Sequence, residues 1–362
     1  MPLTVNPNVN FTSAATQAAF KTELNTLLNE LRTNGAALAD CRGMKNRLIN
    51  GAFNINQAGL TTAADAVYHL DQWYALTESG SATIAQQTNQ EDGQPTSLRM
   101  TQPDVTAKRI GSAQPIESIN CRDLRGQTVA LRARIRCSSS QAIRWAVVEW
   151  TGTADAITKD VVSSWSNATF TTGNFFIATT TTIAATGSVT PAANTWTDLL
   201  ASATISSSAN NLIVFIWSEG TLAQNATLDL GLVQLAQGAQ TPFESARPIG
   251  VELALAQRYY QKSYDLGTAP GTVVSGIQFI ASGTGGEAAP TIINPVPMRT
   301  TPSVVIYSPF DGAVGFHRNY TAAANFAMTG FNVLSSVHHS GSSTSHTSGQ
   351  IYGYHFTKSA RL

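Results

Sequence analysis

Charged side chains are scarce in this sequence. Asp, Glu, Lys and Arg make up 12% of the 362 residues, about half of the roughly 25% that is usual in soluble domains. The 22 basic and 22 acidic side chains cancel, so the formal net charge is zero. A neutral chain has no overall attraction for nucleic acid or an anionic membrane, so we expect neither as a partner.

Cysteine is equally rare, and the sequence shows neither a signal peptide nor an apolar run long enough to cross a membrane. Cys41, Cys121 and Cys137 are odd in number and form no C-x-x-C pair, which argues against a disulfide framework or a zinc knuckle. The opening MPLTVNPNVNF lacks the basic start and apolar core of a signal peptide. No apolar run approaches the roughly 20 residues that cross a bilayer. These absences predict folding in a reducing cytoplasm.

Apolar residues nevertheless make up 43% of the chain, and they recur at every second position. In QTVALRARIRC the apolar side chains of residues 129, 131, 133, 135 and 137 fall on one face of a strand. Similar stretches, punctuated by Gly, Asn, Ser and Pro, continue from about residue 45 to residue 243 and predict a β-sandwich or jelly roll. No βα alternation is present, which argues against a dinucleotide-binding fold.

Helical periodicity is confined to residues 13–34 and 249–262. In the first of these, four apolar residues at spacings of 4, 3 and 4 form a seam, with Asn34 at the next heptad position: Phe20, Leu24, Leu27 and Leu31. The seam has two interpretations, which are docking onto the β-domain of the same chain, or oligomerisation and attachment to a larger assembly.

We therefore predict a mainly β protein with four parts. Residues 1–44 form an extended arm and a helix, and residues 45–246 form a central jelly-roll β-sandwich. Residues 247–263 form a short linker helix, and residues 264–362 form a smaller C-terminal β-sandwich.

The phrase LINGAFNINQAG, from Leu48 to Gly59, reads as the first strand of the jelly roll because Phe53 and Ile55 stand two residues apart. We expect it to lie beside the last strand, with Phe53 in one core together with Leu230 or Leu232.

Three phrases carry a family resemblance: NRLINGAFNINQAG, DQWYAL and LDLGLVQLAQGAQTPFESARPIGVELALAQRYYQKSY. Residues 45–265, which contain them, resemble bacteriophage and prophage tail-fibre or head-fibre (spike) proteins with a jelly roll like that of carbohydrate-binding modules. The resemblance implies a virion protein, assembled in the host cytoplasm as a homotrimer. Its N-terminal segment would contact other virion proteins, and its β-domains would bind host cell-surface polysaccharide.

Related jelly rolls often carry an acidic residue after the first-strand Phe that helps to hold a structural calcium ion. This chain has Asn54 there. Asp229 remains a candidate metal ligand, with less charge than a hard cation prefers. No other cofactor is predicted.

Six tryptophans are candidates for stacking on sugar rings: Trp73, Trp145, Trp150, Trp165, Trp196 and Trp217. Trp145 and Trp150 stand five apart on one strand and should face opposite ways. We select Trp150, which precedes Thr151-Gly152, as the exposed member of the pair.

Arg132, Arg134 and Arg136 form a basic stripe that is unusual in so neutral a chain. It could grip an acidic glycan, or it could pair with acids on neighbouring strands. Five histidines lie near the C-terminus, and we interpret them as loop residues, with a shared metal site in an oligomer as the alternative: His317, His338, His339, His346 and His355.

No catalytic motif appears in a fitting context, and we predict no catalytic residues. The leading hypothesis is a phage fibre or spike subunit that attaches to host glycans. Its rivals are a virion connector or decoration protein, a cellular carbohydrate-binding module, and a glycan-degrading tailspike-type enzyme.

Overall fold

The computed structural model describes residues 21–26, 28–29, 45–88, 96–238, 246–284, 290–328, 330–343 and 346–362. The chain divides into two compact units, Met1–Lys45 and Asn46–Leu362. In the first unit, residues 21–26 and 28–29 are helical, and the side chains of Leu24 and Leu28 are exposed. Phe20, Leu27, Leu31, Asn34 and Cys41 lie outside the described residues, so the predicted seam stays a prediction.

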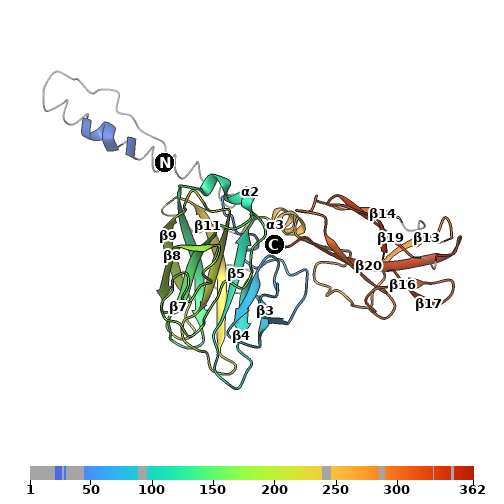
Figure 1. The fold of residues 1–362 in the computed structure, drawn as a ribbon, viewed down its shortest axis with the longest axis horizontal. Coiled ribbons are helices and arrows are strands. Elements are labelled where there is room, and N and C mark those ends of the chain that lie inside the picture. The colour runs from blue at the N-terminus through green and yellow to red at the C-terminus, as the bar shows by residue number, and fades with distance from the viewer. Residues whose placement is uncertain are drawn as a thin grey trace. The chain divides into compact units, whose positions relative to one another are not determined.

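The central domain is a sandwich of two antiparallel sheets (Figure 1). The six-stranded sheet runs, in spatial order, β1 (Thr62–Ala64), β3 (Ser81–Thr88), β4 (Thr96–Thr101), β11 (Thr227–Gln237), β6 (Thr128–Cys137) and β9 (Thr197–Thr204). The five-stranded sheet runs β2 (Tyr74–Thr77), β5 (Ile110–Ile116), β10 (Asn211–Ser218), β7 (Ile143–Trp150) and β8 (Thr181–Val189). The chain passes from one sheet to the other at most connections, as expected of a jelly roll.

The alternation of apolar residues explains the packing of the two sheets. The inward side chains of both sheets form one core, which includes Leu131 and Ile135 of β6 and Val214 and Ile216 of β10. The described residues between 60 and 240 contain only two short helical turns, α2 (Ser118–Cys121) and η2 (Arg122–Leu124). The predicted mainly β sandwich is therefore confirmed.

One long connection covers the outer face of the five-stranded sheet. Residues 151–180, between β7 and β8, contain no regular strand. Phe175 and Phe176 of this connection are buried against Phe215 and Trp217 of β10, in a second apolar cluster. The sandwich therefore has apolar packing on both faces of this sheet.

The phrase Leu48–Gly59 is not a strand, and this prediction was wrong. Asn50 and Phe53 adopt positive φ angles of 56° and 57°, which a strand does not allow. The predicted neighbours are nevertheless correct. Gly51 O accepts a hydrogen bond from Val233 N of β11 at 2.9 Å, and Phe53 lies in the same core as Leu230.

The approach at Gly51 is too close for any side chain. A Cβ there would lie 2.1 Å from the carbonyl oxygen of Val233. Gly51 is thus required by its contact with β11, which bulges between Gly231 and Gln234.

The linker helix α3 (Ile249–Gln257) is shorter than predicted, because Tyr260–Lys262 form strand β12. Pro248 occupies the N-cap position of the helix. The buried pair Arg247–Glu252 anchors the helix, with Glu252 accepting a hydrogen bond from the backbone N–H of Asn50. Ile55 of the opening phrase packs against this helix.

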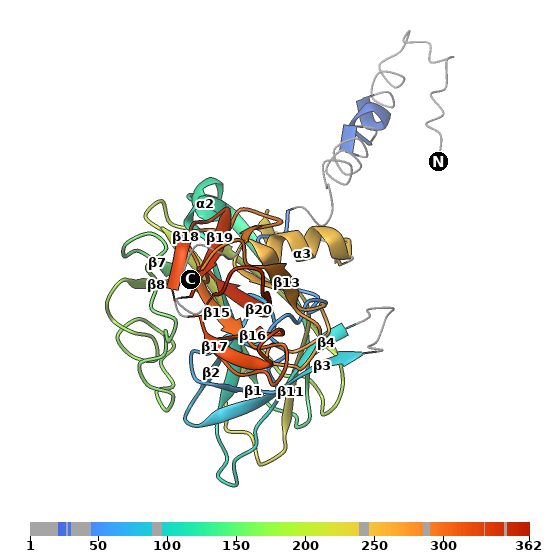
Figure 2. The same ribbon diagram turned by 90° about the vertical axis from the view of Figure 1, so that its right-hand side faces the viewer.

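The C-terminal domain is a second, smaller sandwich. Its larger sheet has β20 (Ile351–Ser359) at the centre, paired with β12, β13 (Ile277–Ile280), β15 (Ser303–Tyr307) and β16 (Phe316–Asn319), while β17 (Ala324–Ala327) pairs with β16 (Figure 2). Its smaller sheet has the order β14 (Thr291–Ile293), β19 (His338–Ser342) and β18 (Gly330–Leu334). Tyr354 and Phe356 of β20 contribute to the core of this domain.

The interpretation of the C-terminal histidines as loop residues was wrong for most of them. His317 lies in β16, His338 and His339 in β19, and His355 in β20. His317, His339, His346 and His355 are all buried. The stretch from His338 therefore begins as strand β19, which pairs with β14 and β18.

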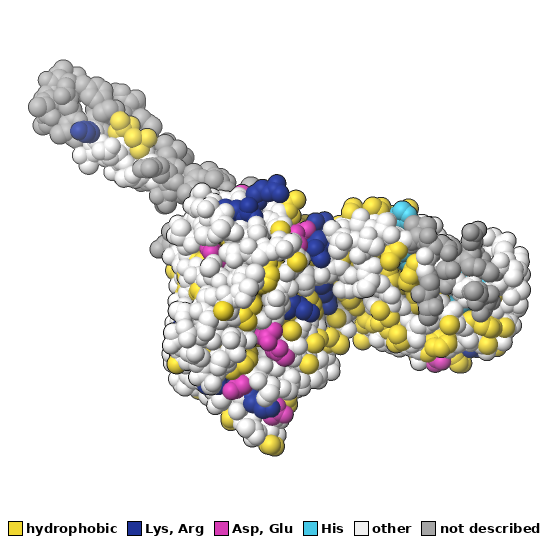
Figure 3. All heavy atoms as spheres, in the orientation of Figure 1, with side chains coloured by type: hydrophobic (Ala, Val, Ile, Leu, Met, Phe, Trp, Pro, Cys, Tyr) yellow, Lys and Arg dark blue, Asp and Glu magenta, His cyan; other side chains and the backbone are white. Residues whose placement is uncertain are grey.

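The surface is mainly neutral, with charged groups few and scattered on the face that Figure 3 shows. Among the described residues, no helix has the length and apolarity needed to cross a membrane.

Candidate functional site

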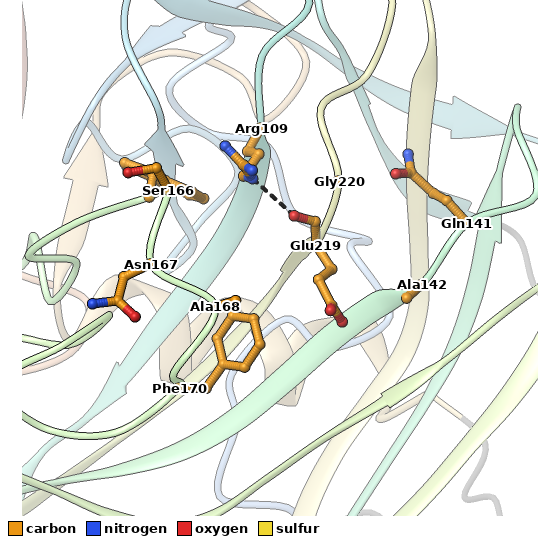
Figure 4. A pocket seen from close by; sticks show the side chains of 10 residues that line it. Arg109, Gln141, Ala142, Ser166, Asn167, Ala168, Phe170, Glu219 and Gly220 are labelled. Carbon is orange, nitrogen blue, oxygen red and sulfur yellow. Dashed lines mark hydrogen bonds between the residues drawn. The ribbon is translucent and has the colours of Figure 1, made fainter.

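A pocket of about 370 Å³ lies at one end of the five-stranded sheet (Figure 4). The sheet supplies residues just before β5, just before β7 and just after β10, which meet at this end because the strands are antiparallel. The long β7–β8 connection forms the opposite wall. The lining residues are Arg109, Gln141, Ala142, Trp165, Ser166, Asn167, Ala168, Phe170, Glu219 and Gly220.

An ion-pair network fixes the polar wall of the pocket. Arg109 Nε donates to the backbone oxygen of Glu219 at 2.8 Å, and its Nη1 donates to Glu78 Oε1 at 2.9 Å. The Glu219 carboxylate accepts two hydrogen bonds from Arg144 on a single oxygen, Oε2, at 2.8 and 3.0 Å. The other oxygen, Oε1, has no protein partner among the described residues, so it is available to a hydroxyl donor.

Aromatic side chains form the opposite wall. Trp165 is half-buried and meets the rings of Phe175 and Phe215 edge-on, with centroids 5.8 and 6.0 Å away. Phe170 lies under the guanidinium of Arg144, which is 3.6 Å from the ring centroid. The apolar cluster on the outer face of the sheet thus supports the aromatic wall from behind.

The chemistry of this pocket suits a neutral, hydroxyl-rich ligand. Both cationic groups near it already have carboxylate partners. Glu219 Oε1 and the amide of Gln141 offer hydrogen bonds, while Trp165 and Phe170 offer apolar surface. Apolar and aromatic lining with a few placed polar groups is the usual composition of a small-molecule site.

Trp150 is not exposed, contrary to expectation. It retains only 4% of its accessible surface, and its Nε1 donates to the backbone oxygen of Thr153 at 2.9 Å. A Cβ at Gly152 would lie 2.9 Å from the indole, so the glycine forms part of its cover. Trp145 and Trp150 do face opposite ways, but the β7–β8 connection covers the outer face that Trp150 occupies. Its predicted contact with a glycan has no exposed surface to support it.

The arginine stripe lies on the six-stranded sheet and is paired with acids on neighbouring strands. Arg134 Nε lies 3.3 Å from Asp198, and Arg132 Nη2 lies 4.0 Å from the same carboxylate. Arg136 pairs with Asp229 at 2.7 Å and stacks on Trp196. The stripe therefore pairs with acids on neighbouring strands, which was the second of its two interpretations. A role in binding an acidic glycan stays a prediction.

Asp229 is fully buried, and arginines engage both of its carboxylate oxygens. Arg99 Nε donates to Oδ1 at 2.8 Å, and Arg136 Nε donates to Oδ2 at 2.8 Å. A calcium ion there would have to displace two guanidinium groups. Asn54 instead accepts a hydrogen bond from the Thr96 hydroxyl. No group of three or more His, Cys, Asp or Glu arranged for a metal occurs in the described part of the chain.

Two histidines contact serine hydroxyls, but neither pair is accessible to a substrate. His69 is fully buried, and its Nδ1 accepts a hydrogen bond from Leu70 N at 2.7 Å. Its Nε2 therefore carries the proton and donates to Ser112, so it cannot take a proton from that hydroxyl. His355, beside Ser263, is only 3% exposed.

Most of the pocket was not singled out from the sequence. Trp165 was one of six candidate tryptophans, while Arg109, Gln141, Phe170 and Glu219 were not singled out. The segment SSWSNATF carried a usable signal, because an aromatic residue flanked by small polar residues is typical of a surface loop. The convergence of three strand ends depends on topology, which no local pattern contains.

The fold defines the chain as a protein of two β-sandwich domains. No family model matches the sequence, and no curated protein matches it. The similar solved structures include carbohydrate-binding modules and a phage tailspike domain.

Three of these structures illustrate the likeness. The enzymatically active domain of tailspike protein 4 from bacteriophage CBA120 has a TM-score of 0.33 at 11% identity, over 54% of this chain and 22% of that one. A family 61 carbohydrate-binding module bound to β-1,4-galactotriose has a TM-score of 0.32 at 9% identity, over 53% of this chain and 99% of that one. A putative sugar-binding protein from Bacteroides thetaiotaomicron has a TM-score of 0.32 at 13% identity, over 53% of this chain and all of that one.

Proposed function

We propose that this protein is a carbohydrate-binding subunit of a phage fibre or spike, and that the pocket at the end of the five-stranded sheet holds the sugar. The observation that carries the proposal is the pairing of an aromatic wall with hydrogen-bonding groups at Glu219 and Gln141. The phage context is supported by the terminal phrases of the jelly roll, above all NRLINGAFNINQAG.

Binding is favoured over hydrolysis by the number of acids in the pocket. Glycosidases use two carboxylates about 5 to 9.5 Å apart across the scissile bond. Glu219 is the one carboxylate among the residues that line the pocket, and Arg144 holds one of its oxygens. An assay for new reducing ends on bound glycans should therefore remain negative.

The test is a glycan array of bacterial surface polysaccharides, probed with the full-length protein. Trp165→Ala should weaken binding by about tenfold or more, because a central aromatic contact typically contributes at least about 1.4 kcal/mol. Trp196→Ala is the matched control, since Trp196 is half-buried on the other sheet against Arg136. Equal losses in both variants would contradict the assignment, and no binding by the wild type would favour a connector without host contact.

Attachment and trimerisation through the N-terminal helix belong to the same proposal. The exposed Leu24 and Leu28 leave apolar surface on the described helix, which a second and third copy could cover at about 25 cal/mol per Å². Light scattering should give three times 38.4 kDa. Deleting residues 1–40 should weaken trimerisation or incorporation into virions. A monomeric wild type whose deletion variant enters particles normally would contradict both roles.

A further inference from the structure

The C-terminal sandwich buries a lysine between its two sheets. Lys358 lies on β20 and retains only 1% of its accessible surface, although a lysine is almost never fully buried without an acidic partner. Among the described residues, its amine contacts the side-chain oxygen of Asn294 and the ring of Phe356, whose centroid is 4.7 Å away. Neither partner carries a charge, so this burial calls for an explanation beyond an ion pair.

The side-chain amide of Asn294 is held in place against this amine. Asn294 follows β14 in the facing sheet and is buried. Its Oδ1 accepts a hydrogen bond from Lys358 Nζ, and its Nδ2 donates to the backbone oxygen of Ser336 at 2.8 Å. The backbone N–H of Asn294 donates to Val337 O at 2.7 Å. The amine is therefore fixed beside the carbonyl group of an amide that cannot turn away.

The amine of Lys358 is suited to act as a nucleophile. Burial lowers the pKa of Lys358 to about 8, so about a tenth of the amines are uncharged at pH 7. An uncharged lysine in an apolar surrounding is an activated nucleophile. Burial also excludes water, which would otherwise compete for the amide carbon.

We propose that Lys358 and Asn294 join their side chains in a covalent amide bond once the domain has folded. The lone pair of Lys358 Nζ forms a bond to Asn294 Cγ, and the Cγ–Nδ2 bond breaks. One proton passes from Nζ to the departing nitrogen, which leaves as ammonia. The step needs no oxidant, reductant or other reactant. Ser336 O keeps a partner after ammonia has left, because Met298 N also donates to it at 2.8 Å.

The imidazole of His339 is the candidate carrier of that proton. His339 is fully buried on β19, opposite Ile292 of β14, and its ring lies 4.7 Å from the ring of Phe356, which the amine also contacts. Neither of its ring nitrogens has a hydrogen-bond partner among the described residues. Burial and the charge of Lys358 lower the pKa of His339 to about 3, so the imidazole is neutral and can accept one proton while it donates another.

The bond would tie the smaller sheet of the domain to the larger one. Asn294 extends β14 and Lys358 lies on β20, and these strands belong to different sheets. Like a disulfide, such a cross-link restricts the unfolded chain. Unlike a disulfide, it persists in a reducing cytoplasm.

The test is mass spectrometry of the full-length protein, unfolded and digested with trypsin. Trypsin does not cut after an amidated lysine, so cleavage at Lys358 should disappear. Residues 263–299 should then remain joined to residues 319–361, with a mass about 17 Da below the sum of the two peptides, which is the mass of ammonia. Cyclisation of an asparagine onto the next backbone nitrogen also releases ammonia, but Pro295 has no N–H and prevents it here.

Lys358→Arg and Asn294→Ala are the decisive variants, because each removes one reacting group. Both should yield only separate peptides, and Lys358→Arg should restore cleavage at that position. Lys262→Arg is the matched control, since the amine of Lys262 donates to the backbone oxygens of Leu266 and Thr268. It should keep the joined peptides. His339→Phe should leave a larger unjoined fraction shortly after synthesis, and an unchanged fraction would exclude His339 as the proton carrier.

Two results would overturn the bond: separate peptides in the wild type, or joined peptides that persist in Asn294→Ala. If one variant fails to fold, the wild-type digest and the other variant still decide. Because no readout involves a sugar, the outcome is independent of the glycan-binding test.

Discussion

Replacing Phe53 with alanine tests how the opening phrase joins the fold. The side chain is fully buried in the main core, with its ring 5.2 Å from that of Trp73. Truncating a buried Phe to Ala costs about 3–5 kcal/mol, from lost apolar burial and the cavity that remains. In a domain of this size, each kcal/mol lowers the Tm by about 2–4 °C. We therefore expect a decrease of about 6–20 °C.

The backbone of Phe53 allows a sharper comparison. At a φ of 57° a residue with a Cβ is strained by about 1–2 kcal/mol, and glycine is not. Alanine keeps that strain, so Phe53→Gly should be more stable than Phe53→Ala. In an ordinary strand the order would be reversed, because glycine weakens a strand by its entropy.

Tryptophan fluorescence is a suitable assay because all six tryptophans lie between residues 73 and 217, within the jelly roll. Unfolding of this domain is then observed separately from that of the C-terminal domain. A loss below about 1 kcal/mol for Phe53→Ala would show that Phe53 is not part of a packed core. Equal or lower stability of the glycine variant would refute the argument from its φ angle.

Two further predictions concern buried ionisable groups. Asp229→Asn should lower the stability of the jelly roll by about 1–3 kcal/mol in urea unfolding, because the guanidinium groups of Arg99 and Arg136 lose their charged acceptor. The loss stays moderate because both arginines are partly exposed, so water can replace the carboxylate as their acceptor. An unchanged urea midpoint would contradict this prediction. Burial and the nearby His346 lower the pKa of His317 to about 4. The folded state therefore binds fewer protons than the unfolded state between about pH 6.5 and 4, and C-terminal stability should fall as the pH drops through that window. Calorimetry of His317→Phe from pH 7 to 4 should show a shallower decline, and parallel profiles would exclude this histidine as a cause.

The mainly β sandwich could be predicted because the alternation of apolar residues within strands such as β6 shows which of their side chains are buried. A period of two places alternate residues of β6 on one face, and the structure buries all five of them: Val129, Leu131, Ala133, Ile135 and Cys137. The conformation of Leu48–Gly59 could not be predicted in the same way. Its apolar residues also alternate, but Asn50 and Phe53 bend the backbone to meet β11 and α3, and those partners lie some 180 to 200 residues along the chain.

The candidate site could not be predicted for the same reason, because it is formed by segments that lie far apart in the sequence. Trp150 has a sequence suited to exposure, and a loop of thirty residues that follows it removes that exposure. Glu219, Arg109 and Gln141 become neighbours only because β10 pairs with both β5 and β7. A pattern read along the chain records which face a residue occupies, and not which other segment covers that face.

The position of β20 has a consequence for the rate of folding. It pairs with β12, β13, β15 and β16, and all of these precede it in the sequence, the first by most of the length of the domain. Contacts between such distant segments require large loops to close before any pairing stabilises them, which slows the search for the native state. Until β20 joins them, the edges of its four partners remain open to pairing with other chains. Refolding yield of this domain should therefore decrease as protein concentration rises, even where the folded protein is stable.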